Sequence, residues 1–538
     1  MNETRDQWDT AISRRTLVRR GVLTGLSGVA FAPLLAACGG TTPANTSPTT
    51  LPTVPPRAQP TMLPPTSAAS TVPQPTVPQP TVPPMAPPSA QPTMPPPPTV
   101  APTTPATAAT TAPTVGATAA ASRDAATGSA APASAPAPIL FVHGNGDSAA
   151  LWITTLWRFE ANGYPRERLF TIDYPNPTAR DDDAIPQPSR SGTDEQRTQL
   201  AARVDTVLAQ TGAPQLILIG NSRGANSIRN YVKNGGAARV SHVVLGGGVN
   251  HGVYVMPGNN SEFNGAGRFL QILNAGSEVV PGVAFLTIRS DRFDKYAQPM
   301  LASGGPSGIG YDAPALAGAT NIVLEGIDHR ETAFGPRAFA EMFRFVTGRV
   351  GTPEIMLEAG VRLSGLITGF ENKVPTNGGV AGIGVTVYET DPATGARRGA
   401  PAYQMTTGGD GAWGPFTGQP TAQYEFVVQQ PGGPVRHFFR SPFPRSSSVV
   451  SMRLFEDAPL PDGGQVIFTR PRGYVATGRD KHLLDGAPVP GVKEGVPTDA
   501  SFKVPITGSE RGVRASLNGE ALTVRAIPGE VVYAEFHY

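Results

Sequence analysis

Six short apolar runs, separated by stretches with helical periodicity, constrain most strongly what residues 138–350 can fold into. Continuous runs of Val, Ile, Leu and Phe are typical of parallel strands that are buried on both faces. Between them, Leu200, Val204 and Val207 recur at helix spacing, and another helix pattern begins at Pro336. Alternating strands and helices predict an α/β fold with a mostly parallel sheet covered on both faces. The runs are Ile139–Val142, Leu169–Ile172, Leu216–Ile219, His242–Leu245, Val283–Ile288 and Asn321–Leu324.

A Gly-x-Ser-x-Gly pattern, Gly220–Gly224, follows the third run directly and precedes a plausible helix start. The pattern alone is weak because a glycine-rich chain of this length produces it by chance, but the strand-turn-helix context strengthens it. A nucleophile on such a sharp turn has a strained backbone, and side chains two residues to either side would clash. The sequence therefore predicts Ser222 as a nucleophile.

A serine nucleophile requires a histidine to take its proton and a carboxylate to orient that histidine. The chain has seven histidines. His329 is the preferred base because it follows the last predicted strand, where the order Ser, acid, His places it. His251 is the rival, whereas His143 fits a structural role in its turn and His242 lies within a strand. The other three, His437, His482 and His537, are expected at the surface of the region after residue 350.

Two carboxylates qualify as the acid, because the strand Val283–Ile288 is followed by both Asp291 and Asp294. The segment His143-Gly144-Asn145-Gly146 after the first strand is a candidate oxyanion loop, and a plain glycine turn is the alternative. Backbone N–H groups there would stabilise the negative oxygen of a tetrahedral intermediate.

With these motifs, residues 138–350 resemble the bacterial class 2 lipases, which are minimal members of the α/β-hydrolase superfamily. The whole arrangement resembles the two-domain archaeal long-chain lipases. The resemblance implies oxyanion N–H groups from Asn145 and Arg223. It favours Asp294 as the acid, because the family pattern has a proline five positions later, here Pro299.

One departure from the minimal lipases is an apolar stretch between two strands, at residues 254–257 and 269–273. Minimal lipases lack a cap at this place. These residues could form an apolar lid or acyl-chain wall, and ordinary core packing is the alternative interpretation.

After Gly348 the sequence changes to short β-branched segments separated by Gly, Pro and Asn. Residues 355–456 resemble a transthyretin-like or carboxypeptidase-regulatory-like β-sandwich. Residues 457–538 are expected to form a further C-terminal β domain, with a hairpin whose turn is Asn518-Gly519.

The N-terminal residues 1–38 resemble a twin-arginine export signal joined to a lipobox that ends at Cys38, the chain's single cysteine. A lone cysteine excludes an intramolecular disulfide. Residues 39–137 are rich in Pro, Thr and Ala and predict an extended, disordered linker. We expect an exported protein at the cell surface, held to the membrane by acyl chains on Cys38 and facing outward.

Composition argues against a nucleic-acid partner, because charged residues make up 16% of the chain and the net charge is +2. We expect no cofactor and no metal; Asp181-Asp182-Asp183 could bind calcium, but a solvated charge run is the preferred interpretation. Three functions remain: a lipase or esterase acting through an acyl-enzyme on Ser222, a polyester depolymerase with the same triad, and a non-catalytic surface binding protein. The partner would be a lipid or a polymeric ester; the oligomeric state stays open.

Overall fold

The computed structural model describes residues 135–460 and 463–538. The predicted export signal, Cys38 and all but the last residues of the predicted linker lie outside this part. The described residues fall in one compact unit by their contacts. Within them, no helix has both the length and the apolar character that a membrane span needs.

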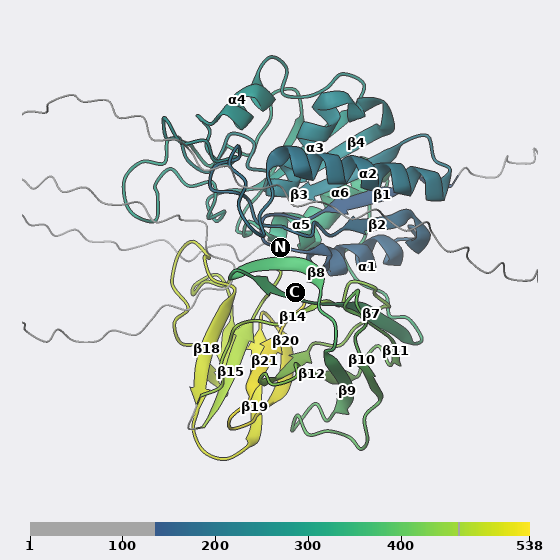
Figure 1. Ribbon diagram of the computed structural model, residues 1–538, viewed down its shortest axis with the longest axis vertical. Coiled ribbons are helices and arrows are strands. Elements are labelled where there is room, and N and C mark those ends of the chain that lie inside the picture. Colours follow the sequence, from purple (N-terminus) through teal and green to yellow (C-terminus); the bar gives the residue numbers. More distant parts are fainter. Residues whose placement is uncertain (1–134, 461–462) are drawn as a thin grey trace, which may run out of the picture. The chain divides into compact units, whose positions relative to one another are not determined.

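Residues 138–350 contain a sheet of six strands in the order β2-β1-β3-β4-β5-β6, and every neighbouring pair is parallel. Figure 1 labels β1, β2, β3 and β4 of this sheet. Each strand coincides with one of the six apolar runs to within three residues, so the predicted α/β fold is confirmed. The strands are β1 Ile139–Val142, β2 Leu169–Ile172, β3 Leu216–Asn221, β4 Val240–Gly246, β5 Ala284–Ser290 and β6 Thr320–Leu324.

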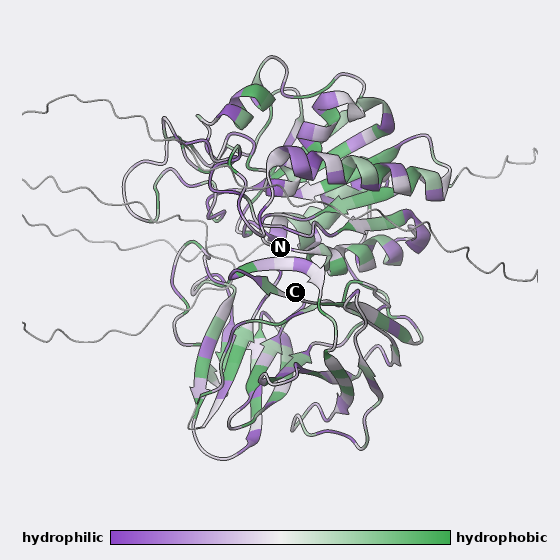
Figure 2. Cartoon of the chain, in the orientation of Figure 1, coloured by the Kyte–Doolittle hydropathy of each residue, from purple (hydrophilic) through white to green (hydrophobic). Residues whose placement is uncertain are grey.

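Helices cover both faces of this sheet. Along β3, Ile217 and Ile219 join a core with α1, α5 and α6, while Leu216 and Leu218 join a core with α2 and α3. This is the alternation expected of a strand with period two. Figure 2 shows the resulting apolar strands between helices whose outer faces are polar. The helices are α1 Ile153–Ala161, α2 Thr193–Thr211, α3 Arg223–Tyr231, α4 Arg268–Asn274, α5 Glu331–Phe334 and α6 Pro336–Thr347, with short turns η1 Ala149–Trp152, η2 Arg166–Arg168, η3 Val232–Gly236 and η4 Ala237–Arg239.

The region after residue 350 is built around a seven-stranded sheet in the order β10-β9-β12-β13-β21-β15-β18. Two four-stranded sheets accompany it: β11-β7-β14 with β8, and β17-β16-β19-β20. The strands are β7 Val361–Glu371, β8 Val374–Gly379, β9 Gly384–Thr390, β10 Tyr403–Thr406, β11 Ala412–Gly418, β12 Gln423–Gln429, β13 Val435–Arg440, β14 Met452–Arg453, β15 Gly464–Thr469, β16 His482–Leu484, β17 Ala487–Pro488, β18 Ser501–Ile506, β19 Arg511–Leu517, β20 Glu520–Ala526 and β21 Val531–Glu535.

The expected boundary at residue 457 does not separate two sheets, because β21 inserts between β13 and β15 and pairs with both. On β21, Val531 and Tyr533 face the core shared with β7 and β11, whereas Val532 and Ala534 face the core shared with β19 and β20. The long sheet is thus the middle of three layers. The pairing of β21 with β13 and β15 was not predicted, because strand pairing between distant segments leaves no local sequence signal.

The expected hairpin is present between β19 and β20, where Leu517 pairs with Glu520. Asn518 and Gly519 have φ angles of 50° and 93°. Positive φ at both central residues is what a tight hairpin turn of this kind requires.

Three histidines of the β region were wrongly expected at the surface. His437, His482 and His537 are all buried. His537 lies where the two regions meet, with its ring 5.4 Å from that of Trp157 on α1 and 4.6 Å from that of Phe443. Burial together with the charges of Arg472 and Arg440 holds the pKa of His537 well below its ordinary value. These imidazoles therefore belong to the packing of the β region.

Candidate active site

Ser222 lies at the sharp turn between β3 and α3, with φ of 56° and ψ of −122°. Its N–H donates to the carbonyl of Gly246 at 3.0 Å. A Cβ on Gly224 would come within 2.5 Å of the carbonyl oxygens of Val142 and His143, so only glycine fits there. The strained turn and its glycine have the form that presents a nucleophile above a sheet.

His329 and Asp294 come from loops that follow β6 and β5. Nδ1 of His329 is 2.8 Å from Oδ2 of Asp294, and both side chains are buried. Nε2 of His329 has no hydrogen-bond partner among the described residues. This buried nitrogen is therefore available to a group in the pocket that Ser222 and His329 both line.

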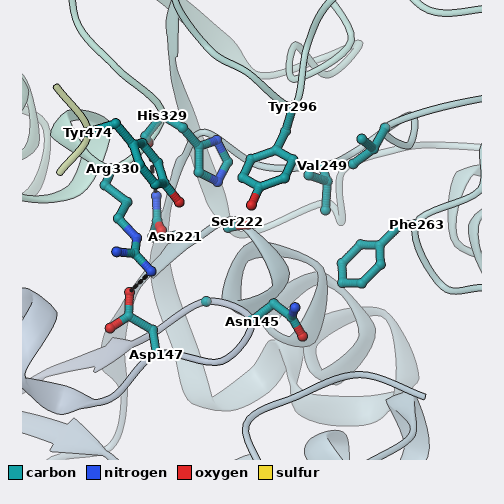
Figure 3. A pocket seen from close by; sticks show the side chains of 12 residues that line it. Asn145, Asp147, Asn221, Ser222, Val249, Phe263, Tyr296, His329, Arg330 and Tyr474 are labelled. Carbon is teal, nitrogen blue, oxygen red and sulfur yellow. Dashed lines mark hydrogen bonds and ion pairs between the residues drawn. The ribbon is translucent and has the colours of Figure 1, made fainter. Parts of the chain in front are cut away.

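That pocket brings together side chains from both regions of the chain (Figure 3). Its lining residues are Gly144, Asn145, Asp147, Asn221, Ser222, Val249, Val253, Phe263, Tyr296, His329, Arg330 and Tyr474. Its volume is about 30 Å³. Sites for drug-sized ligands measure roughly 300–1,000 Å³, so this pocket is much smaller than such a site.

Two segments of the chain match sequence models of known families. Residues 136–274 match the sequence model described as "Lipase (class 2)", and residues 359–457 match "Lipase C-terminal domain". The hydrolase region is similar to class 2 lipases. Both matched families are lipase families, so these two segments of the chain are similar to hydrolases of the lipase and esterase type. No curated protein matches the sequence.

Similar solved structures include three lipolytic enzymes. The propeptide form of Bacillus licheniformis lipase BlEst2 has 14% identity and a TM-score of 0.31, with 73% of this chain and 94% of that chain covered. Aspergillus fumigatus lipase B has 14% identity and a TM-score of 0.32, with 41% of this chain covered; the chain spans 54% of that lipase. Legionella pneumophila phospholipase PlaB has 10% identity and a TM-score of 0.31, with 59% of this chain and 93% of that chain covered.

In the class 2 lipase-like region, the competing acid Asp291 lies away from the histidine. Its Oδ1 accepts hydrogen bonds from the N–H of Gly326 and the hydroxyl of Ser290. Burial raises the pKa of Asp291, but backbone N–H groups outweigh this effect and the net shift is downward. Asp291 thus ties the β5 loop to the β6 loop, while Asp294 contacts the imidazole.

The rival base His251 has both ring nitrogens engaged outside the pocket. Nδ1 lies 2.8 Å from the carbonyl of Ala313, and Nε2 lies 2.7 Å from Oε1 of Glu278. His143 is fully buried and its Nε2 accepts the N–H of Tyr174, in agreement with a structural role. The structure therefore brings His329, not His251 or His143, to the pocket with Ser222.

The two predicted oxyanion residues flank the nucleophile differently. Asn145 lines the pocket, and its Oδ1 accepts the N–H of Ala179, which holds the loop. Arg223 is the first residue of α3, and the first N–H groups of a helix have no partner within it. The Arg223 side chain points away, where it is buried in a two-point ion pair with Glu262 at 2.5 and 2.7 Å.

The apolar stretch considered as a lid does not line the pocket in the lipase-like region. On α4, Leu270 and Leu273 are buried, whereas Ile272 is exposed, as is Val255 in the preceding loop. Neighbouring residues of the same segment, Val253 and Phe263, line the pocket instead. Core packing accounts for the buried residues of this stretch.

The aspartates 181–183 are engaged by protein groups. Asp183 accepts the N–H and hydroxyl of Thr193 at the start of α2, and Asp182 accepts the side-chain amide of Asn260. In the described part of the chain, no group of three or more His, Cys, Asp or Glu side chains could hold a metal ion.

Several residues of the site carry no motif in the sequence. Asn221 donates from its side-chain amide to the carbonyl of Gly246 and to Thr332, whose hydroxyl in turn binds the carbonyl of His329. The ring of Tyr296 lies 4.6 Å from that of His329. Tyr474 comes from the loop after β15, and only the three-dimensional structure brings it to the pocket.

Proposed function

We propose that the protein is a serine carboxylic ester hydrolase that acts through an acyl-enzyme on Ser222, with Asp294 and His329 completing the triad. The single observation that carries the proposal is the buried His329 imidazole, bonded through Nδ1 to Asp294 and with Nε2 free of described partners in the pocket of Ser222. The similarity to lipase families supports an ester as the substrate.

In the proposed reaction, Nε2 of His329 takes the hydroxyl proton as Oγ of Ser222 attacks the ester carbonyl carbon. The carboxylate of Asp294 holds the Nδ1 tautomer and stabilises the imidazolium that forms. The N–H groups of Asn145 and Arg223 would hold the developing oxyanion, and one such donor contributes about 3 kcal/mol. The imidazolium then protonates the leaving alcohol, and water hydrolyses the acyl-enzyme by the same proton route.

The test is Ser222→Ala compared with the full-length wild type on p-nitrophenyl esters of increasing acyl length. We expect a loss of at least about 10³-fold in kcat, because nucleophile and base act as one unit. Thermal unfolding should be little changed, since the Ser222 side chain makes no hydrogen bond within residues 135–460 and 463–538. Equal rates in the two proteins would remove the enzymatic proposal and leave a binding protein.

We further propose, from the sequence of residues 1–38 alone, that the enzyme is exported by the twin-arginine route and anchored through Cys38. Metabolic labelling with a fatty acid tests this proposal. Wild-type protein should carry the label and fractionate with membranes, and Cys38→Ala should do neither. Labelled or membrane-bound Cys38→Ala would contradict it.

A further inference from the structure

The pocket around Ser222 has two chemically different sides. In Figure 3, Val249, Phe263 and the ring of Tyr296 lie on one side of Ser222, whereas Arg330 and Tyr474 lie on the other side of it. The second side is polar, because Nη2 of Arg330 pairs with Oδ2 of Asp147 at 3.2 Å. An ester bound at Ser222 would therefore place its acyl and alcohol parts in different surroundings.

The reaction chemistry determines which side of the pocket holds the alcohol part of the ester and which holds the acyl part. This inference rests on the proposed acyl-enzyme function. When the tetrahedral intermediate collapses, the leaving oxygen must take its proton from Nε2 of His329 and so must lie within hydrogen-bond reach of it. The alcohol part then extends along the side next to His329. The acyl chain is left with the apolar side of Val249 and Phe263.

We propose that the β region selects the alcohol part of the substrate, with Tyr474 as the residue that limits its size. The ion pair of Arg330 and Asp147 places a guanidinium and a carboxylate on this side of the pocket, and hydroxyl groups can hydrogen-bond to both kinds of group. The substrate class is therefore an ester of a small polar alcohol, such as glycerol, rather than of a bulky apolar alcohol.

Tyr474 is held firmly enough to act as a wall. Its ring contacts two cations, with Nζ of Lys295 at 3.9 Å and Cζ of Arg330 at 5.1 Å from the ring centroid. Its N–H donates to Oδ2 of Asp328 at 2.9 Å, and its carbonyl accepts from Arg479 at 2.7 Å. The side chain is buried. A bulky alcohol would have to displace this ring against all of these contacts.

The first experiment uses the wild-type chain and captures the acyl-enzyme with added alcohols. Capture transfers the acyl group from Oγ of Ser222 to the alcohol oxygen, whose proton passes to Nε2 of His329 and on to Oγ. Each alcohol competes with water from the leaving-group side, so the product ratio is independent of acyl binding. We expect glycerol to give at least about tenfold more transfer per mole than cyclohexylmethanol, the size of effect that pocket fit commonly produces.

The second experiment compares Tyr474→Ala with Val249→Ala as a matched truncation on the opposite side. Tyr474→Ala should raise relative transfer to cyclohexylmethanol at least about tenfold and leave the acyl-length profile within about twofold. Val249→Ala should change the acyl-length profile and leave the relative transfer to cyclohexylmethanol within about twofold. If Tyr474→Ala yields no soluble protein, Tyr474→Leu shortens the ring and supplies the same comparison, with an expected change of at least about threefold.

The outcomes separate this inference from the proposed function. Active wild type with no preference among alcohols, or a Tyr474 variant that changes only the acyl-length profile, would overturn the inference and leave the hydrolase proposal intact. A wild type no faster than Ser222→Ala would instead overturn the proposed function itself.

Discussion

The nucleophile and the two groups that would activate it are held in place by different regions of the molecule. The Ser222 turn is fixed within the lipase-like region: its N–H bonds to Gly246, and the buried side chain of Arg223 pairs with Glu262. The loops of His329 and Asp294 are fixed by the β region. Next to His329, Asp328 accepts hydrogen bonds from Tyr474, Arg470 and Arg479.

The neighbour of the acid makes a corresponding contact. Nζ of Lys295 donates to the carbonyl of Thr498 at 2.7 Å. The comparison teaches that the serine turn is held by contacts within the lipase-like region, whereas the loops of His329 and Asp294 also receive contacts from the β region. We call the contacts of Asp328, Glu331, Arg470 and Arg479 the β clamp.

Replacing Asp294, the proposed acid of the triad, should have the largest effect on kcat. We expect Asp294→Asn to lower kcat by about 10³–10⁴-fold, because the amide no longer holds the required imidazole tautomer. Asp291→Asn is the matched control, since it alters the same loop without touching His329. Its activity should stay within about tenfold of wild type. A larger loss of kcat for Asp291→Asn than for Asp294→Asn would show that Asp291, and not Asp294, is the acid.

The sequence could predict the parts of this site that depend on local order. Each strand of the parallel sheet is a short apolar run, and the serine turn carries its glycines within five residues, so both are visible in a linear pattern. Asp294 and His329 follow predicted strands, which is why their meeting could be anticipated. The choice between Asp291 and Asp294 needed the family resemblance.

Tyr474 and the β clamp could not be predicted, because they depend on contacts between distant segments. Tyr474 meets Asp328 across 146 residues of sequence, and neither residue belongs to a periodic pattern or motif. The three-layered β region escaped prediction for the same reason, since the pairing of β21 with β13 and β15 is not encoded in β21 alone. The buried histidines were misplaced because their exposure follows from this long-range packing.

Breaking the ion pair of Arg223 and Glu262 beside the Ser222 turn should mainly reduce the free energy of unfolding. Glu262→Gln leaves the Arg223 guanidinium buried without its countercharge, and breaking a buried pair in this way costs about 3–5 kcal/mol. Urea unfolding followed by fluorescence measures the change. Asp205→Asn is the control, because its pair with Arg239 is exposed and should contribute less than about 1 kcal/mol. Equal losses in the two variants would show that burial of the pair is unimportant.

Breaking the β clamp should affect the rate more than the fold. Burial and the neighbouring charge of Glu331 raise the pKa of Asp328, while Arg470 and Arg479 oppose this shift. Arg479→Gln removes one of the two cations that hold Asp328 beside His329. We expect kcat to fall about 10- to 100-fold, as small misplacements of a catalytic group do. Arg511→Gln, which alters an exposed pair with Asp485, is the control.

If Arg479→Gln keeps the wild-type kcat, the β clamp does not position His329. A parallel fall in kcat and in thermal stability would instead indicate a general loosening of the fold. Only a fall in kcat with a nearly unchanged unfolding midpoint matches the proposed division between the two regions.

The smallest effect is expected at a contact between the two regions that lies outside the pocket. Glu358 accepts the N–H and hydroxyl of Ser446 at 2.8 and 2.6 Å, and it also pairs with Arg166. Burial raises the pKa of Glu358, but these bonds outweigh it and the net shift is downward. A folded-state pKa below the unfolded one stabilises the protein above the ordinary glutamate pKa, about 4.3.

That stabilisation is lost as the pH falls through the lowered folded-state pKa of Glu358. We therefore expect Glu358→Gln to lower the unfolding midpoint at pH 7 by an amount equivalent to about 1 kcal/mol, and the difference from wild type to shrink toward pH 3. Glu354→Gln, at an exposed position nearby, should match wild type at every pH. Ester hydrolysis at pH 7 should be unchanged in both variants. A Glu358→Gln protein with reduced kcat would mean that docking of the β region as a whole, and not the clamp beside His329, sets the relay.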